Sequence, residues 1–207
     1  MVDIAPSMLC ADFGRMREAA EMVGPHSAYL HMDIMDGHFV PNLTMGPDLV
    51  KSLAGIAPLD VHLMVTDPIN FIEDFKDAGA EIISVHVEAN NPLKALESIK
   101  KNNMKAGIAL NPSTPENSIE PFIDLADLIL VMSVEPGYGG QDFHEDAVER
   151  VRRYKEAYPN KIIEVDGGVG PSNSERLADA GADILVAGSA IFKADDPIEI
   201  VKIMKGS

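Results

Sequence analysis

Apolar residues of this 207-residue chain gather in eight short segments, each followed by a longer segment where they recur every three to four positions. The short segments predict strands at about residues 1–7, 30–35, 59–64, 81–87, 105–110, 127–132, 161–165 and 183–187. The longer segments predict helices at about residues 12–24, 47–54, 68–78, 91–103, 115–125, 145–158, 171–180 and 197–204. Strands that alternate with helices favour a parallel sheet, and eight such units close a barrel. We therefore predict one domain over residues 1–207, an α/β fold of the (β/α)8 TIM-barrel class.

A histidine and an aspartate interrupt the apolar pattern of the second predicted strand. Side chains alternate between the two faces of a strand, so Leu30, Met32 and Ile34 share one wholly apolar face. The other face carries His31 and Asp33 into a different interior. Such groups are seldom buried without a partner or a task. The pair is compatible with half of a metal site or with a satisfied buried ion pair.

Two further strands supply polar groups that face the same interior. His62 lies on the inward face of the strand at 59–64, and Asp166 follows the strand at 161–165. Active sites of TIM barrels lie where the carboxyl ends of the strands meet. We therefore expect His31, Asp33, His62 and Asp166 to form a four-ligand site for one divalent metal. This nitrogen and oxygen set suits zinc, iron(II), cobalt or manganese and does not choose among them.

Other titratable residues near this site leave alternatives open. His86 faces inward on the fourth strand, where a structural role and a place at the substrate's edge are equally compatible with its position. Asp60 and Glu164 face inward deeper in the barrel, where they either orient the metal ligands or pair with Lys105. Three histidines fall in loops or at helix ends and are expected to be solvated: His26, His38 and His144.

Glycine follows three consecutive strands of the predicted barrel. The segments are Gly137 to Gly140, which includes Tyr138 and Gly139, then Gly167 and Gly168, and finally Gly188 and Ser189. Without side chains, backbone N–H groups can approach an anion, and barrels often bind phosphate after strands seven and eight. Turns also need glycine, but three adjacent segments favour a phosphate cradle. No lysine or arginine lies in these segments, so we expect backbone dipoles to hold the phosphate.

Methionine ends three of the inward-facing strands. Met35, Met64 and Met132 each lie close in sequence to one of the polar positions or glycine segments. Methionine usually fills cores. Beside a metal and a phosphate, these three side chains are also suited to form an apolar wall that excludes water from a charged intermediate.

The composition narrows the possible partners. A formal net charge of −16 argues against nucleic acid and anionic membranes, because both would repel the chain. The sequence shows neither a run of about 18 apolar residues nor a basic segment followed by an apolar one, so we expect no membrane span and no signal peptide. A single cysteine, Cys10, is typical of a reducing compartment, and we expect a cytoplasmic protein.

Seven blocks of the sequence, taken in order, resemble the ribulose-phosphate 3-epimerase family. The blocks are residues 5–13 (APSMLCADF), 30–42 (LHMDIMDGHFVPN), 60–64 (DVHLM), 86–89 (HVEA), 131–141 (VMSVEPGYGGQ), 164–169 (EVDGGV) and 186–192 (VAGSAIF). The resemblance implies interconversion of D-ribulose 5-phosphate and D-xylulose 5-phosphate in pentose phosphate metabolism. It also implies one divalent metal per subunit, zinc first among the choices, a homo-oligomer, and no nucleotide cofactor.

The resemblance also assigns roles to residues. The family's metal ligands fall on His31, Asp33, His62 and Asp166, and its acid and base fall on Asp33 and Asp166. Its substrate contacts fall on Ser7, His62 and the three glycine segments. We hypothesise that one aspartate removes the C3 proton while the other donates a proton from the opposite face. The metal would stabilise the enediolate between these steps.

The chain departs from the family pattern in two places and leaves three alternatives. It is shorter around the helix after the fourth strand, and Tyr138 stands where phenylalanine is usual. Allulose-6-phosphate 3-epimerase shares the segment MDGHFVPN, although residues 86–89 and 166–169 look closer to the ribulose enzyme. A decarboxylase or isomerase on the same barrel would need a lysine at a strand's carboxyl end, whereas Lys105 and Lys161 lie at strand starts. A non-catalytic barrel that binds sugar phosphates would have little reason to keep both aspartates.

Overall fold

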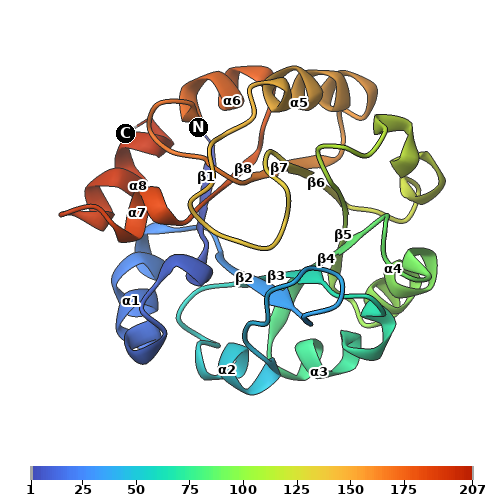
Figure 1. Cartoon of the computed structure of the whole chain (residues 1–207), viewed down its shortest axis with the longest axis horizontal. Helices are drawn as coiled ribbons and strands as arrows, with labels where there is room; N and C mark the ends of the chain where they lie inside the picture. The colour runs from blue at the N-terminus through green and yellow to red at the C-terminus, as the bar shows by residue number, and fades with distance from the viewer. Residues whose placement is uncertain (1, 207) are drawn as a thin grey trace.

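Eight parallel strands line the centre of the computed structural model, which describes residues 2–206 (Figure 1). They are β1 (Asp3–Pro6), β2 (Leu30–Met35), β3 (Leu59–Met64), β4 (Ala80–His86), β5 (Lys105–Leu110), β6 (Leu128–Met132), β7 (Ile162–Asp166) and β8 (Ile184–Ala187). From β2 to β8 each strand pairs with the next, β8 pairs with β1, and a single bridge between Ser7, just after β1, and His31 closes the ring. The predicted TIM barrel is confirmed. Met1 and Ser207, which belong to the predicted range, lie outside the described residues.

Helices surround the strands on the outside of the barrel (Figure 1). The α-helices are α1 (Met16–Val23), α2 (Pro47–Ser52), α3 (Ile72–Asp77), α4 (Pro92–Lys101), α5 (Asp146–Ala157), α6 (Ser174–Ala180), α7 (Ser189–Phe192) and α8 (Pro197–Lys205). Short 3-10 helices are η1 (Met8–Cys10), η2 (Phe13–Arg15), η3 (Gly24–His26), η4 (Pro68–Asn70) and η5 (Glu116–Phe122). The short helix α7, which follows β8 directly, is absent from the sequence prediction.

Three predicted helices differ from the structure. The helix expected at 68–78 begins as the 3-10 helix η4, and α3 starts only at Ile72. The helix expected at 115–125 is wrong, because residues 116–122 form the 3-10 helix η5. Pro121 lies inside this segment and has no N–H to donate to an α-helical bond. The helix expected from Asp12 begins as the 3-10 helix η2, and α1 starts only at Met16. The Asp12 carboxylate caps η2 by accepting a hydrogen bond from the Gly14 N–H.

The strands bury two separate apolar layers. Outward-facing residues such as Leu30, Met32 and Ile34 belong to the large cluster between the strands and the helices, as the alternation of β2 predicts. A smaller cluster fills the barrel interior: Ala5, Ile82, Ala109, Leu128, Leu130, Met132, Ile184 and Val186. This packed interior supports the polar groups at the carboxyl ends of the strands, because side chains of neighbouring strands stack in layers.

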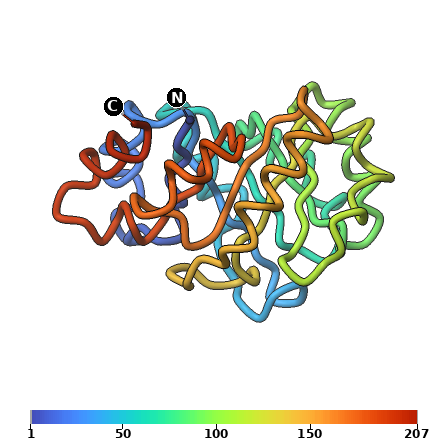
Figure 2. Tube along the Cα trace, turned by 90° about the horizontal axis from the view of Figure 1, so that it is seen from above, coloured from blue at the N-terminus to red at the C-terminus, as the bar shows by residue number. Residues whose placement is uncertain are grey.

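Two long loops cover the carboxyl end of the barrel. Figure 2 shows the segments near residues 40 and 140 projecting from the same end of the molecule, opposite to the termini. The Asn42 side chain joins the two loops by donating to the Gly137 carbonyl over 2.9 Å. The Asp36 carboxylate anchors the first loop, because it accepts hydrogen bonds from the backbone N–H groups of His38, Phe39 and Thr66. Both loops therefore have defined positions over the barrel mouth.

Within residues 2–206, every helix is too short or too polar to cross a lipid bilayer.

Candidate active site

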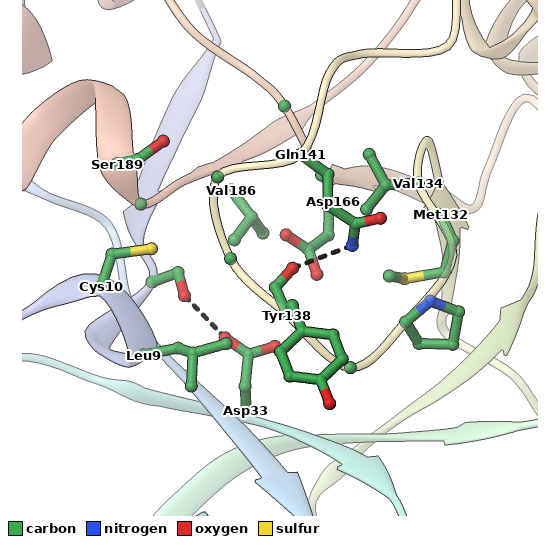
Figure 3. Close-up of a pocket in the computed structure, with 18 of the residues that line it drawn as sticks. Leu9, Cys10, Asp33, Met132, Val134, Tyr138, Gln141, Asp166, Val186 and Ser189 are labelled. Atoms are coloured by element: carbon green, nitrogen blue, oxygen red, sulfur yellow. Dashed lines mark hydrogen bonds between the residues drawn. The ribbon is translucent and has the colours of Figure 1, made fainter. Parts of the chain in front are cut away.

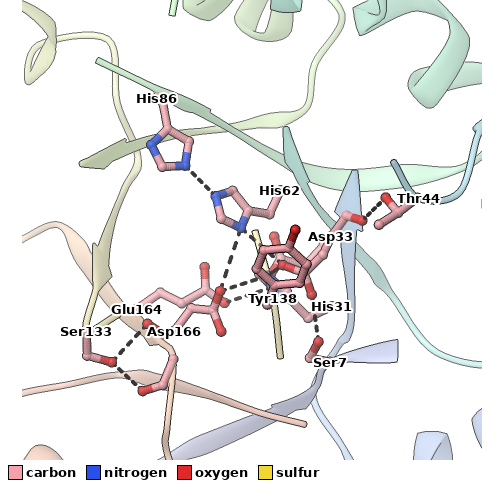
Figure 4. A network of polar contacts seen from close by, with 12 residues as sticks. Ser7, His31, Asp33, Thr44, His62, His86, Ser133, Tyr138, Glu164 and Asp166 are labelled. Atoms are coloured by element: carbon pink, nitrogen blue, oxygen red, sulfur yellow. Dashed lines mark hydrogen bonds and ion pairs between the residues drawn. The ribbon is translucent and has the colours of Figure 1, made fainter. Parts of the chain in front are cut away.

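The four predicted metal ligands converge inside the carboxyl end of the barrel (Figure 4). His31 and Asp33 come from β2, His62 from β3, and Asp166 from the end of β7, and their ligand atoms all lie within 4.8 Å of one another. Asp33 Oδ1 lies 3.5 Å from His31 Nε2 and 3.3 Å from His62 Nδ1. Asp166 Oδ2 lies 4.0 Å and 3.7 Å from the same two nitrogens. Residues far apart in the sequence thus form one cluster of two imidazoles and two carboxylates.

The donor atoms of this cluster fit a divalent cation. His31 Nδ1 faces Asp60 Oδ2 at 2.5 Å, and a carboxylate only accepts, so this nitrogen carries the proton. His31 Nε2 is buried and has no hydrogen-bond partner among residues 2–206. It faces Asp33 Oδ1 and Asp166 Oδ2, and the ionised Asp33 favours a positive charge between them. Either a proton on Nε2 or a divalent metal supplies that charge, and nitrogen and oxygen donors are what such metals prefer.

Asp33 is held in place from both sides. Ser7 Oγ donates to Asp33 Oδ2 over 2.6 Å, and Thr44 Oγ1 donates to the Asp33 carbonyl over 2.6 Å (Figure 4). Burial alone would raise the pKa of Asp33, but the neighbouring His31 is the largest opposing influence and holds the pKa well below its usual range. Asp33 is therefore ionised.

Asp166 has the opposite electrostatic environment. Burial is the largest influence and the Asp33 charge is the next, and together they raise the pKa of Asp166 to about 7. Its side chain retains 14% exposure at the cavity. One carboxylate is therefore ionised while the other holds a proton near neutral pH. Paired titratable groups with opposite shifts are the usual arrangement for acid and base roles.

A second layer of carboxylates lies behind His31. Asp60 accepts the hydrogen bond from His31 Nδ1, and Glu164 Oε1 lies 3.7 Å from the same nitrogen. Burial and the Asp60 charge raise the pKa of Glu164 well above its usual value. The alternative pairing with Lys105 is wrong. Lys105 starts β5 at the opposite end of the barrel, where its Nζ donates to Tyr29 Oη over 3.0 Å and contacts Glu81.

His86 lies behind His62 and does not line the cavity. The two Nε2 atoms are 2.7 Å apart, and both rings are fully buried. Of the two alternatives that the sequence leaves open, this position favours a structural contact over one at the substrate's edge. The three histidines expected to be solvated are exposed, as predicted: His26, His38 and His144.

A cavity of about 510 Å³, counting space open to solvent, lies above the cluster (Figure 3). Ser7, Asp33 and Asp166 reach it from below. The predicted apolar wall lines it as well, since Met35, Met64 and Met132 are all at its surface and otherwise buried. The cavity therefore presents two carboxylates beside an apolar wall of three methionines.

All three predicted glycine segments meet at the mouth of this cavity: Gly137–Gly140, Gly167–Gly168 and Gly188–Ser189. Gly168 has φ +61, and a Cβ there would lie 2.7 Å from the backbone nitrogen of Phe143. Only glycine fits that position without moving the backbone. Gln141 closes the first segment by donating to the carbonyls of Glu135 and Tyr138. Tyr138 also lines the cavity and is 58% exposed.

The structure adds a cation that sequence reasoning missed. Lys193 Nζ lies 3.9 Å from the point where a Cβ on Gly140 would be. The expectation that backbone dipoles act without a basic side chain is therefore incomplete. Lys193 follows α7, the short helix that the sequence analysis did not predict, so no pattern in the three glycine segments indicated it. Thr44 was missed for a similar reason, because it lies on a loop eleven residues beyond Asp33.

The fold and the cavity together define a class of protein, a TIM barrel with a candidate metal site and paired carboxylates at the carboxyl ends of its strands. A model of the ribulose-phosphate 3-epimerase family matches residues 3–192. The chain belongs to this family.

Curated relatives match the chain over its whole length. The cytoplasmic isoform of ribulose-phosphate 3-epimerase from Oryza sativa subsp. japonica is 45% identical over 99% of this chain and 93% of its own. Ribulose-phosphate 3-epimerase from Bacillus subtilis is 41% identical, with both chains fully covered. The enzyme of the same name from Escherichia coli is 44% identical over 98% of this chain and 94% of its own.

Solved structures support the fold alone. A 3-hexulose-6-phosphate synthase matches with a TM-score of 0.78 at 16% identity, covering 99% of both chains. A 3-keto-L-gulonate-6-phosphate decarboxylase from Vibrio cholerae matches with a TM-score of 0.77 at 13% identity, covering 99% of this chain and 96% of that one. The barrel is thus shared with proteins of quite different sequence.

Proposed function

We propose that this protein is a ribulose-phosphate 3-epimerase, which interconverts D-ribulose 5-phosphate and D-xylulose 5-phosphate. The observation that carries the proposal is the pair Asp33 and Asp166, which share one cavity but have pKa values shifted in opposite directions. Inversion at a carbon next to a ketone needs a base on one face and an acid on the other. Relatives that bear this name are 41–45% identical over the full chain.

The two aspartates divide the proton transfer between them. The ionised Asp33 accepts the C3 proton from one face of the sugar, and the protonated Asp166 donates to the other face. In the reverse reaction the two exchange roles. Ser7 holds Asp33 Oδ2 through its 2.6 Å hydrogen bond, which leaves Oδ1 on the side of the histidines. A divalent metal held by His31, Asp33, His62 and Asp166 would supply positive charge where negative charge develops on the substrate oxygens.

The rest of the cavity suits a sugar phosphate. Backbone N–H groups of the three glycine segments are accessible to an anion, and Lys193 adds a cation beside Gly140. Met35, Met64 and Met132 exclude water from the reacting carbon. Lys105 and Lys161 begin or precede strands at the other end of the barrel, so neither is available to a lysine-dependent decarboxylase.

A coupled assay tests this function. The protein is stripped of metal with a chelator, and zinc, iron(II), cobalt or manganese is then restored. We expect turnover of D-ribulose 5-phosphate to fall at least about 100-fold on stripping and to return with metal. A higher kcat/KM for D-allulose 6-phosphate would instead assign the hexose substrate. Tight binding of ribulose 5-phosphate without turnover under every metal would identify a non-catalytic sugar-phosphate-binding barrel.

Three finer assignments are part of the same proposal. We take zinc as the first metal to test, because imidazole and carboxylate donors suit it. A homo-oligomer follows from the family resemblance. We place the protein in the cytoplasm because its single cysteine is typical of a reducing compartment.

A further inference from the structure

Three side chains form a linear chain of hydrogen bonds that leads away from the candidate metal site. His62 Nε2 lies 2.7 Å from His86 Nε2, and His86 Nδ1 lies 3.1 Å from Glu88 Oε2 (Figure 4 shows the two imidazoles). Both rings are fully buried, while the Glu88 side chain is 24% exposed at the outer end. Neither His86 nor Glu88 lines the cavity or takes part in the proposed proton transfer.

Glu88, at the outer end of this series of hydrogen bonds, determines which atoms donate and which accept. Glu88 Oε1 accepts from the Asn111 N–H over 2.9 Å and from the Thr114 hydroxyl. Glu88 is thus an ionised carboxylate that can only accept hydrogen bonds. His86 Nδ1 must therefore carry a proton and donate it to Glu88.

The remaining positions follow one from the next. Only one proton fits between the two Nε2 atoms. A His62 ring that binds a cation through Nδ1 carries that proton on Nε2, so His86 Nε2 is bare and accepts the hydrogen bond. His62 Nε2 then carries the only proton of its ring. His62 Nδ1 is bare, and it is this nitrogen that lies 3.3 Å from Asp33 Oδ1 and 3.7 Å from Asp166 Oδ2.

We propose that His86 and Glu88 are positioning residues that hold His62 in the tautomer whose Nδ1 lone pair is free to bind a divalent cation. The inference rests on the proposed metal-dependent function and adds two residues to it. His31 reaches the same result by a shorter route, since Asp60 accepts directly from its Nδ1 and leaves Nε2 facing the cluster. The two histidines thus present opposite ring nitrogens to one site, each fixed by a carboxylate on its far side.

The tautomer is measured directly in the metal-free wild-type protein. Long-range proton–nitrogen NMR of chelator-treated, 15N-histidine-labelled protein distinguishes protonated from bare ring nitrogens, and a His62→Asn variant assigns the His62 signals. We expect a proton on Nε2 and a bare Nδ1 at neutral pH. A proton on Nδ1 overturns the proposal, and this measurement needs no substitution at His86 or Glu88.

Variants of His86 and Glu88 are compared by their affinity for zinc, which is measured by competition with a chromophoric chelator. In Glu88→Gln the amide has only one oxygen that can accept. When that oxygen accepts from the Asn111 N–H, His86 Nδ1 loses the acceptor that orients it. In His86→Phe the acceptor for His62 is removed. We expect both variants to bind zinc about 10- to 100-fold more weakly. His86→Gln restores an acceptor and should recover most of the affinity, which loss of packing alone would not allow.

Thr114→Val is the matched control. It removes a donor to the other Glu88 oxygen and leaves the His86 contact in place, so zinc affinity and the His62 tautomer should stay as in wild type. If Glu88→Gln and His86→Phe both bind zinc as tightly as wild type, the positioning role of His86 and Glu88 is overturned while the proposed function stays intact. A wild-type protein that binds no divalent metal would instead overturn the proposed function, and the NMR result in metal-free protein would still report the tautomer.

Discussion

The two sides of the cavity recognise their ligand by different means. The carboxylate half, His31, Asp33, His62 and Asp166, consists of buried side chains that rise from strands. The glycine half, Gly137–Gly140, Gly167–Gly168 and Gly188–Ser189, consists of backbone in loops after the strands. The first half is surrounded by groups that fix charge and tautomer, such as Ser7 and Asp60.

The difference shows how one barrel separates chemistry from binding. Side chains on strands have little freedom. The 3.3 Å contact between Asp33 and His62 can therefore stay fixed while Asp33 exchanges a proton with the substrate. Backbone in glycine segments needs only to stay open to an anion. Changes in the carboxylate half should therefore act mainly on kcat, and changes in the glycine half mainly on KM.

The largest effect is expected from replacing either aspartate. Asp33→Asn removes the proton acceptor and Asp166→Asn removes the proton donor, so kcat should fall by about 1,000-fold or more in each variant. Exchange of the C3 proton with solvent, followed by NMR in deuterated water, should disappear in both variants. The exposed Asp195→Asn serves as the control for loss of one negative charge. Continued exchange in either active-site variant would contradict the two-aspartate scheme.

The raised pKa of Asp166 predicts a pH-dependent effect on stability. In metal-free protein its pKa is about 7 when folded, against about 3.9 for an unperturbed Asp. Between these values the folded state binds more protons, so this group's contribution to the free energy of unfolding falls as pH rises. Asp166→Asn lacks this dependence. Its Tm should therefore exceed that of metal-free wild type by a margin that grows from pH 4 to pH 7, to several degrees.

Thermal unfolding of both proteins without metal, at pH 4, 5, 6 and 7, provides the test. A Tm difference that is constant across this range would show that Asp166 titrates normally in the fold. That result would remove the electrostatic distinction between the two aspartates.

The glycine half should respond to a single methyl group. Gly168→Ala forces a side chain into φ +61 and against the Phe143 backbone, so the loop must shift. We expect KM for ribulose 5-phosphate to rise about 10-fold with a smaller change in kcat. Gly55→Ala is the matched control, because φ is +84 and a Cβ there has no neighbour within 4 Å among the described residues. If Gly168→Ala and Gly55→Ala raise KM equally, the increase comes from backbone strain at a positive φ and not from the place of Gly168 at the cavity.

How far the sequence predicts each half depends on what positions its residues. The period-two pattern of β2 placed His31 and Asp33 on the inner face correctly, since alternation on a strand is a local property. The sequence left two alternatives open for Asp60 and Glu164, including a pair with Lys105, because depth along the barrel depends on the stagger between strands. For η5 the signal was present, as Pro121 falls inside the predicted helix. The contact between His62 and His86 depends on ring orientations, which sequence alone does not specify.

Lys193 sharpens the comparison, because its Nζ lies 3.9 Å from the point where a Cβ on Gly140 would be, beside the glycine half. Lys193→Gln should raise KM for ribulose 5-phosphate about threefold at low salt and leave kcat unchanged, since an exposed charge contributes little. Added salt should reduce the difference from wild type as screening increases. Lys202→Gln on α8 makes the same change in net charge away from the cavity, so it should leave KM as it is. If both variants raise KM equally, the effect belongs to the overall charge of −16, and backbone dipoles alone account for the anion site.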